Sequence, residues 1–277
     1  MTNEIEIIAE IGVNHMGSVA HAHGLIEHAK NCGCDTVKFQ LWDTEKVYPR
    51  ERWEQMKKLE LPRGCFQELK AHAEDLGLRF LCTPDTYNDA VFLKQIGVER
   101  LKIGSSNVTN LTLLRAINEL GLPVILSTGA CDFSEMTAAV VALRRSLVTI
   151  MHCVSAYPTP EDQLNLMAIR HLVSRWYHNR TIGFSDHSSY GPVPALVALG
   201  LGARVFERHM TTSNELPGPD HKASATVSEM HIYVEMLRWG ARCLGDGVKQ
   251  LMPCEVENRR EYDRFVAAQR ERSGVDA

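Results

Sequence analysis

Short apolar segments recur along the chain, and longer segments of mixed polarity separate them. Strands of a parallel sheet bury both faces, so they are read as short, nearly continuous runs of Val, Ile, Leu and Phe bounded by turns. Eight segments have this length and content: residues 6–12, 36–42, 78–84, 99–106, 123–129, 148–155, 181–187 and 204–210.

The segments between these strands have the apolar spacing of amphipathic helices, at residues 22–33, 65–77, 111–121, 134–145, 161–172 and 227–245. Several end in glycine, the residue that a helix C-cap favours, as at Gly33, Gly77 and Gly121. Strand–helix units that repeat without a long linker predict an α/β fold, a (β/α)₈ TIM barrel, and not a doubly wound sheet. We expect a single barrel domain over residues 1–250 and a short C-terminal tail over residues 251–277.

Composition narrows the class of protein. Of 277 residues 44% are apolar and 23% are charged, which is enough apolar content for a large core, and the formal net charge of -4 gives no reason to expect nucleic acid or an anionic membrane as partner. The first residues lack the layout of a signal peptide, and no apolar run reaches the roughly 18 residues of a membrane span. The eight cysteines form no CxxC pair, so we expect reduced thiols in a cytoplasmic protein.

Polar side chains gather at the C-terminal ends of the predicted strands. In a barrel these ends converge on one mouth, where the active site lies. The set comprises Glu10, Asn14, Lys38, Gln40, Thr83, Asp85, Lys102, Ser105, Ser127, Thr128, His152, Ser155, Ser185, His187, Glu207 and His209. Because side chains alternate along a strand, only part of the set faces inward; Lys38 shares a face with Gln40, Ser185 with His187, and Glu207 with His209.

Each of these residues also has a plain structural interpretation. A lone strand histidine is more often a hydrogen-bonded core residue than a ligand, and a lone lysine near a rim usually reaches water. Two buried lysines, however, need an anionic partner. Their coincidence with two histidines and several hydroxyls favours a site for a phosphorylated or carboxylated anion with a metal beside it.

The metal would lie between His187 and His209, on neighbouring strands. Glu10, on the strand that closes the barrel, would complete the site directly or through water, and Asp220 lies in a loop near the same ion. Spacing alone leaves Mn²⁺, Zn²⁺ and Fe²⁺ open. His15 and His221, both on loops, are expected to be surface residues.

Eight motifs occur in the order found in one family: AEIGVNHMGS, TVKFQ, LKIGSS, ILSTGA, MHCVSAYPTP, GFSDHS, FERHMT and GPDHKAS. The chain resembles the N-acetylneuraminate (sialic acid) synthase family from Glu10 to about Arg260. The resemblance implies a barrel that condenses phosphoenolpyruvate with an aldose-derived aldehyde, releases phosphate and forms a 3-deoxy-2-keto sugar acid. It also implies a homodimer.

The resemblance assigns roles to individual residues. Four are catalytic: Lys38 and Lys102 hold phosphoenolpyruvate, Glu10 is the acid near the metal, and Asp220 links metal-bound water and substrate. His187 and His209 are metal ligands, usually for Mn²⁺, with Mg²⁺, Co²⁺, Zn²⁺ and Fe²⁺ as further candidates. The substrate-binding set consists of Gln40, Thr83, Ser105, Asn107, Ser127, Ser155, Tyr157 and Ser185, with Thr83 added from the strand-end pattern.

The sequence departs from the family's pattern at the positions expected to bind the acceptor. Asn107 replaces a glutamate, Ser155 replaces an asparagine, and Asp85 stands where an apolar residue is usual. The small antifreeze-like domain that follows the barrel in the family, with its arginine, is expected to be absent. We therefore expect an acceptor other than N-acetylmannosamine. The alternative is a sialic or legionaminic type of acid synthase that acts on an N-acylated aminosugar, with a separate protein supplying the missing domain.

Three other classes stay open. A Schiff-base aldolase would use Lys38 or Lys102 covalently and would need no metal. A metal-dependent hydrolase or isomerase fits two histidines and an acid but leaves the two strand lysines unexplained. A non-catalytic barrel that binds a sugar phosphate would have less reason to keep every predicted anion and metal position filled.

Overall fold

The computed structural model describes residues 4–176 and 180–273. Each of the first eight strands pairs in parallel with the next, and β1 also pairs with β8, so the sheet closes into a barrel. These strands are β1 (Glu6–Gly12), β2 (Thr36–Leu41), β3 (Arg79–Pro84), β4 (Leu101–Ile103), β5 (Val124–Ser127), β6 (Val148–His152), β7 (Thr181–Asp186) and β8 (Val205–Thr211). A short strand, β9 (Ala225–Thr226), pairs with the end of β8. The predicted (β/α)₈ barrel is confirmed.

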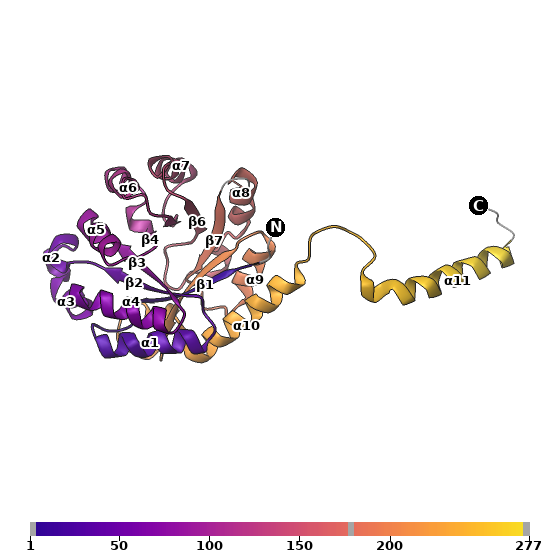
Figure 1. Cartoon of the computed structure of the whole chain (residues 1–277), viewed down its shortest axis with the longest axis horizontal. Helices are drawn as coiled ribbons and strands as arrows, with labels where there is room; N and C mark the ends of the chain where they lie inside the picture. The colour runs from indigo at the N-terminus through magenta and orange to yellow at the C-terminus, as the bar shows by residue number, and fades with distance from the viewer. Residues whose placement is uncertain (1–3, 177–179, 274–277) are drawn as a thin grey trace. The chain divides into compact units, whose positions relative to one another are not determined.

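Helices surround the strands, as Figure 1 shows. They are α1 (Val19–Asn31), α2 (Thr44–Val47), α3 (Trp53–Leu59), α4 (Phe66–Asp75), α5 (Tyr87–Gln95), α6 (Leu111–Asn118), α7 (Phe133–Ala142), α8 (Met167–Trp176), α9 (Val193–Gly200) and α10 (Val227–Cys243). Short 3-10 helices lie in the connections: η1 (Arg50–Arg52), η2 (Arg63–Cys65), η3 (Ser105–Asn107), η4 (Glu161–Gln163) and η5 (His221–Ala223). Gly33, Gly77 and Gly121 follow their helices with φ of 83°, 73° and 71°, the left-handed conformation that a glycine C-cap supplies.

Local hydrogen bonding explains where the elements differ from the prediction. Helix α7 was expected to begin at Ser134, but its N-cap is Asp132, which accepts a hydrogen bond from the backbone of Glu135 at 2.8 Å while Glu135 accepts one from the backbone of Asp132 at 2.9 Å. Helix α9 was not predicted, because its sequence VPALVALG is apolar throughout and has no period to detect. Strand β4 stops at Ile103, since the 3-10 turn η3 follows directly.

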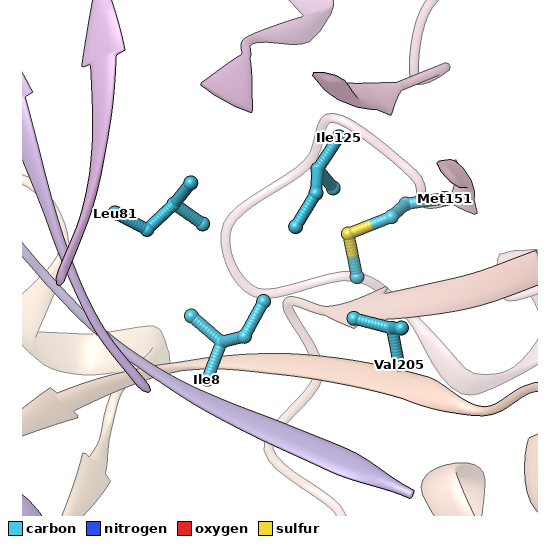
Figure 2. Packing of buried hydrophobic residues seen from close by; sticks show 5 residues of the cluster. All are labelled: Ile8, Leu81, Ile125, Met151 and Val205. Carbon is cyan, nitrogen blue, oxygen red and sulfur yellow. The ribbon is translucent and has the colours of Figure 1, made fainter. Parts of the chain in front are cut away.

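The floor of the barrel is an apolar layer. Ile8, Leu81, Ile125, Met151 and Val205 come from five strands and meet at its centre (Figure 2). Side chains two residues farther along a strand return to the same face. On four of these strands the next inward positions are polar: Glu10, Thr83, Ser127 and Glu207. The barrel therefore changes from an apolar floor to a polar mouth within one step of the strand period.

The contacts divide the described chain after Cys243. The first unit contains the barrel strands and the helices through α10. The second unit, from Leu244, contains η6 (Pro253–Glu255) and α11 (Val256–Ser273), which exposes Tyr262, Phe265 and Val266. The expected domain boundary, after residue 250, falls inside this second unit. In the part of the chain that is described, no helix is both long and apolar enough to cross a membrane.

Candidate active site

A cavity of about 440 Å³ opens at the C-terminal ends of the barrel strands. It brings together residues from the C-terminal ends of all eight barrel strands and the loops that follow them. The residues that line it are Glu10, Lys38, Gln40, Tyr48, Thr83, Asp85, Lys102, Gly104, Ser105, Ser106, Ser127, Ala130, Ser155, Tyr157, Ser185, His187, Glu207, His209 and Asp220. Of the residues that were assigned a catalytic, binding or metal role, Asn107 is outside this lining, and so are Asn14, Thr128 and His152 of the strand-end set.

The deepest polar group of the cavity is the carboxylate of Glu207. Its Oε1 atom accepts hydrogen bonds from Nζ of Lys38 at 2.9 Å, from Nζ of Lys102 at 3.3 Å and from Oγ of Ser185 at 3.1 Å. The two lysines are 4% and 2% exposed, and Glu207 is 2% exposed. The anionic partner that two buried strand lysines require is therefore provided by β8, which lies across the barrel from β4.

The charges in this group perturb one another. Burial disfavours the ionised form of Glu207, but Lys102 and Lys38 outweigh that effect and hold its pKa well below the usual range. Burial alone would lower the pKa of Lys38, yet Glu10 and Glu207 raise it above the ordinary value. For Lys102 burial dominates, and its pKa lies below that of a free lysine. Lys102 is the cation that lacks full compensation, so an added anion would stabilise its charged form.

Glu10 lies beside this group. Its Oε2 atom is 3.4 Å from Nζ of Lys38, and its Oε1 atom accepts a hydrogen bond of 2.6 Å from Nε2 of Gln40. Burial raises the pKa of Glu10, opposed by the charges of Lys38 and His209. Glu10 is thus a fully buried carboxyl group whose proton affinity is increased, as expected of a group that exchanges a proton during a reaction.

His187 and His209 lie next to each other, with their ring centroids 5.6 Å apart. Nδ1 of His187 donates to the carbonyl of Val154 at 2.7 Å, which leaves the lone pair on Nε2. Around that nitrogen lie the hydroxyls of Tyr157 at 3.3 Å and Ser185 at 3.2 Å. Burial, reinforced by His209, lowers the pKa of His187 to about 3, so its ring is neutral, the form that binds metals.

The donor atoms here fit a divalent metal. Nδ1 of His209 and Oε2 of Glu10 are buried and make no hydrogen bond within the described chain. Oδ2 of Asp220 lies 3.5 Å from that His209 nitrogen. Within the described residues no three His, Cys, Asp or Glu side chains are grouped closely enough to hold an ion by themselves. The protein would supply two imidazoles and leave the remaining positions to water and substrate oxygen.

Hydroxyl groups form the wall opposite the histidines. Oγ of Ser105 accepts a hydrogen bond from the backbone N–H of Gly129 at 3.0 Å and contacts Sγ of Cys153 at 3.3 Å. A Cβ atom on Gly129 would lie 2.3 Å from Oγ of Ser155 and 2.9 Å from Oγ of Ser105. Glycine is therefore required at this position so that the strand β5 loop can approach the two serines.

Three sequence interpretations change in the structure. Asn107 lies on η3 outside the cavity lining, and its Oδ1 accepts a hydrogen bond from Nδ2 of Asn110 at 3.3 Å. His15 and His221 were expected on the surface, but both are buried. Nδ1 of His15 accepts from the backbone of Gly17 at 3.0 Å, and Nδ1 of His221 lies 2.8 Å from the hydroxyl of Thr211, so both shape loops at the rim.

Two important residues were not assigned a role from the sequence. Glu207 is two residues before His209, so the two side chains share one face of the strand. That spacing alone could have predicted that Glu207 points into the cavity. Tyr48 follows the four-residue helix α2, which has no detectable sequence period, so nothing in the sequence indicated that it would reach the cavity.

Known proteins resemble this chain in sequence and fold. The profile of the NeuB family matches residues 25–249. The chain is 34% identical to the N,N'-diacetyllegionaminic acid synthase of Campylobacter jejuni, over 91% of this chain and 81% of that protein. It is 31% identical to the human N-acetylneuraminate-9-phosphate synthase, over 95% of this chain and 77% of that protein.

A crystal structure of N-acetylneuraminic acid synthetase from Leptospira borgpetersenii serovar Hardjo-bovis, in complex with citrate, has the same architecture. It superposes with a TM-score of 0.89 at 34% identity, covering 95% of this chain and 92% of that one. The family profile spans most of the barrel, and the relatives match nearly the whole chain at more than 30% identity. This chain belongs to the NeuB family.

Proposed function

We propose that this protein condenses phosphoenolpyruvate with an aldose or a sugar-like aldehyde other than N-acetylmannosamine, and forms a 3-deoxy-2-keto sugar acid and inorganic phosphate. The observation that carries the proposal is the meeting of Lys38 and Lys102 at one carboxylate, Glu207, in the mouth of a NeuB-family barrel. Relatives of this chain include an N,N'-diacetyllegionaminic acid synthase and an N-acetylneuraminate-9-phosphate synthase. We extend the proposal to a cytoplasmic homodimer. The homodimer rests on the sequence resemblance, and the cytoplasmic location rests on the eight cysteines that form no CxxC pair.

The lysines would bind the anionic groups of phosphoenolpyruvate. Two buried ammonium groups share one carboxylate oxygen, so the cavity floor attracts a further anion. Hydroxyls of Ser105, Ser127 and Ser185 lie in the same lining and can donate to phosphate or carboxylate oxygens. This arrangement would fix the enol carbon toward the open side of the cavity, where an aldehyde enters.

The proposed reaction forms one carbon–carbon bond and one carbon–oxygen bond to water, and it breaks the carbon–oxygen bond between C2 and the phosphate. C3 of phosphoenolpyruvate attacks the aldehyde carbon, and the aldehyde oxygen gains a proton. Water adds to C2, and the resulting tetrahedral carbon expels inorganic phosphate to leave the ketone. Glu10 or Asp220 would orient the water and take its proton, consistent with the raised pKa of buried Glu10. His187 and His209 would hold a Mn²⁺ ion, which would supply Lewis-acid polarisation of the aldehyde oxygen.

Phosphate release tests the proposal. The Mn²⁺-loaded protein is incubated with phosphoenolpyruvate and a panel of aldoses and aminosugars that includes N-acetylmannosamine. Release with one aldehyde other than N-acetylmannosamine supports the full proposal, whereas release with N-acetylmannosamine supports the reaction but contradicts the acceptor. Absence of phosphoenolpyruvate binding by calorimetry overturns it.

A second candidate is a Schiff-base aldolase. The observation in its favour is the lowered pKa of buried Lys102, because a deprotonated amine is the nucleophile of imine chemistry. Borohydride treatment in the presence of substrate distinguishes the Schiff-base aldolase from the condensing synthase. A covalent adduct on Lys102, detected by mass spectrometry and unaffected by a chelator, favours the aldolase. Loss of activity with the chelator and no adduct favours the synthase.

A further inference from the structure

The candidate active-site cavity has two lysines, paired with Glu207 and Glu10, at its floor, and two aspartates, Asp85 and Asp220, at its rim. Lys38 pairs with Leu81 in the register of β2 and β3, and Asp85 stands four residues beyond Leu81 along the chain. Asp85 directly follows Pro84, the last residue of β3, so it stands nearer the open end of the barrel than Lys38 does. Tyr48 and Asp220 join Asp85 in the lining from the loops after α2 and β8. The rim is the part of the cavity that an acceptor would enter after phosphoenolpyruvate occupies the floor.

The carboxylate of Asp85 has no partner among the described residues. Only its backbone is engaged, with the N–H donating to the carbonyl of Leu41 at 3.2 Å. Burial by itself raises the pKa of Asp85 to about 6. Asp85 is half-buried, whereas two fully buried aspartates are paired: Asp186 binds Arg208, and Asp89 binds Arg63. Desolvating a carboxylate without a partner is unfavourable, so a residue of this kind is expected where a ligand brings the hydrogen-bond donors.

No cationic side chain of the described residues lines the rim beside Asp85, where it could pair with a phosphate group. Of the described residues that line the cavity, Lys38 and Lys102 are the cations, and both bind Glu207 at the floor. The guanidinium of Arg52 lies over the ring of Tyr48, 5.3 Å from its centroid, and is outside the lining. A phosphorylated sugar would therefore bring its charge toward Asp85 without a cation beside it to offset the repulsion, because a metal held by His187 and His209 would lie by Asp220.

We propose that Asp85 is an acceptor-recognition residue, whose carboxylate accepts hydrogen bonds from the hydroxyl or amide N–H groups of an unphosphorylated sugar aldehyde. The inference rests on the proposed function and deepens it by naming the class of acceptor. Asp85 occupies one of the positions at which this sequence departs from the family resemblance, and the structure places it where the acceptor would bind.

Matched sugar pairs test the class of acceptor. The Mn²⁺-loaded protein is assayed for phosphate release with phosphoenolpyruvate and each member of four pairs: N-acetylmannosamine, mannose, arabinose and erythrose, each with its terminal phosphate ester. We expect the unphosphorylated member of the productive pair to have the higher kcat/KM. A preference for the phosphorylated member contradicts the inference while leaving the condensation intact.

The variant Asp85→Asn tests the residue. Loss of hydrogen bonds to a charged group predicts a rise of about 10- to 100-fold in KM for the sugar, with KM for phosphoenolpyruvate unchanged within about twofold. Asp75→Asn is the matched control, because it also removes one carboxylate but lies at the exposed end of α4. It should leave KM for the sugar and KM for phosphoenolpyruvate unchanged. If both KM values rise together in Asp85→Asn, or neither does, Asp85 does not recognise the acceptor.

Binding distinguishes failure of this inference from failure of the proposed function. If phosphoenolpyruvate does not bind to the wild-type protein, the proposed function fails. If phosphoenolpyruvate binds but no sugar reacts, the inference is tested by the melting temperature of the phosphoenolpyruvate-loaded protein, measured with each sugar and each sugar phosphate. A melting shift with an unphosphorylated sugar that Asp85→Asn abolishes supports the inference. No shift with any sugar, or a shift that Asp85→Asn retains, overturns it.

Discussion

The ammonium of Lys38 lies 2.9 Å from Oε1 of Glu207, and both side chains are buried in the barrel. The same oxygen also accepts a hydrogen bond from Lys102. Two cations from β2 and β4 thus share one anion from β8. Such a group is stable only while complete, because removal of one partner leaves a buried charge without compensation.

We predict that Glu207→Gln destabilises the barrel strongly. Leaving Lys38 and Lys102 without their shared anion should cost about 3–5 kcal/mol of unfolding free energy, measured by urea denaturation. The double variant Lys38→Met with Glu207→Gln should lose less than the two single variants together, since they act on one interaction. Glu54→Gln is the control, because Glu54 pairs with Lys58 on the exposed surface at 3.0 Å, and it should change stability by less than about 0.5 kcal/mol. Equal losses in Glu207→Gln and Glu54→Gln would show that the buried group carries no special stability.

We predict that Asp85→Asn increases the free energy of unfolding, and that the size of the increase depends on pH. The pKa of Asp85 is raised from 3.8 to about 6 by burial, so the folded protein binds this proton more tightly than the unfolded chain does. The wild-type protein therefore keeps the benefit of the protonated form below about pH 4 and loses it as pH rises through about 6. The neighbouring titratable groups whose pKa Asp85 raises are Tyr48 and Cys82, both of which are neutral in this window.

Melting curves from pH 4 to pH 8 check this prediction. Asp85→Asn should match the wild type near pH 4 and exceed it above pH 6, by up to roughly 2–3 kcal/mol, because one unit of pKa shift corresponds to about 1.4 kcal/mol. A variant that is less stable than the wild type at pH 7 would mean that the Asp85 carboxylate has a stabilising partner.

We predict that variants of His187 or His209 lose Mn²⁺ affinity, whereas a variant of Glu10 loses mainly turnover. Replacing either histidine with alanine removes one of two imidazole ligands, and we expect at least a 100-fold loss in Mn²⁺ affinity, by order of magnitude. Glu10→Gln should reduce turnover much more than Mn²⁺ affinity, because its proposed role is to handle a proton. Titration followed by Mn²⁺ electron paramagnetic resonance measures affinity without reference to activity. His231→Gln, on the exposed face of α10, is the control. Equal losses of affinity and turnover in Glu10→Gln would remove Glu10 from the proton-transfer role.

Gly129→Ala should damage the anion site. The new methyl group would lie 2.3 Å from Oγ of Ser155 and 2.9 Å from Oγ of Ser105, so one of the serines must move. Overpacking of this kind costs about 1–3 kcal/mol of stability, and we expect KM for phosphoenolpyruvate to rise. Gly24→Ala in α1 meets no atom within 4 Å and should stabilise the helix by about 0.5–1 kcal/mol. Unchanged phosphoenolpyruvate binding in Gly129→Ala would place the anion elsewhere in the cavity.

Much of the architecture is local enough to be predicted. Strand β1 is apolar from Ile7 to Ala9, and the period of two then places the polar residue Glu10 on the same face as Ile8, in the mouth. The same period correctly placed Gln40 beside Lys38, and His187 beside Ser185, in the cavity lining. Helix α9 was missed for the converse reason, since a uniformly apolar helix contains no alternation to detect.

By itself, the sequence determined the barrel and the end of it at which the polar residues gather, because both follow from periodicity along one strand at a time. The tertiary structure decided which charges meet. Glu207 joins two lysines that are 169 and 105 residues away in sequence. Asp85 reaches the cavity with no side-chain partner among the described residues, and Asn107 bonds to Asn110. Charge pairing depends on distances across the barrel and on exclusion of water, and neither is encoded in the pattern of any single segment.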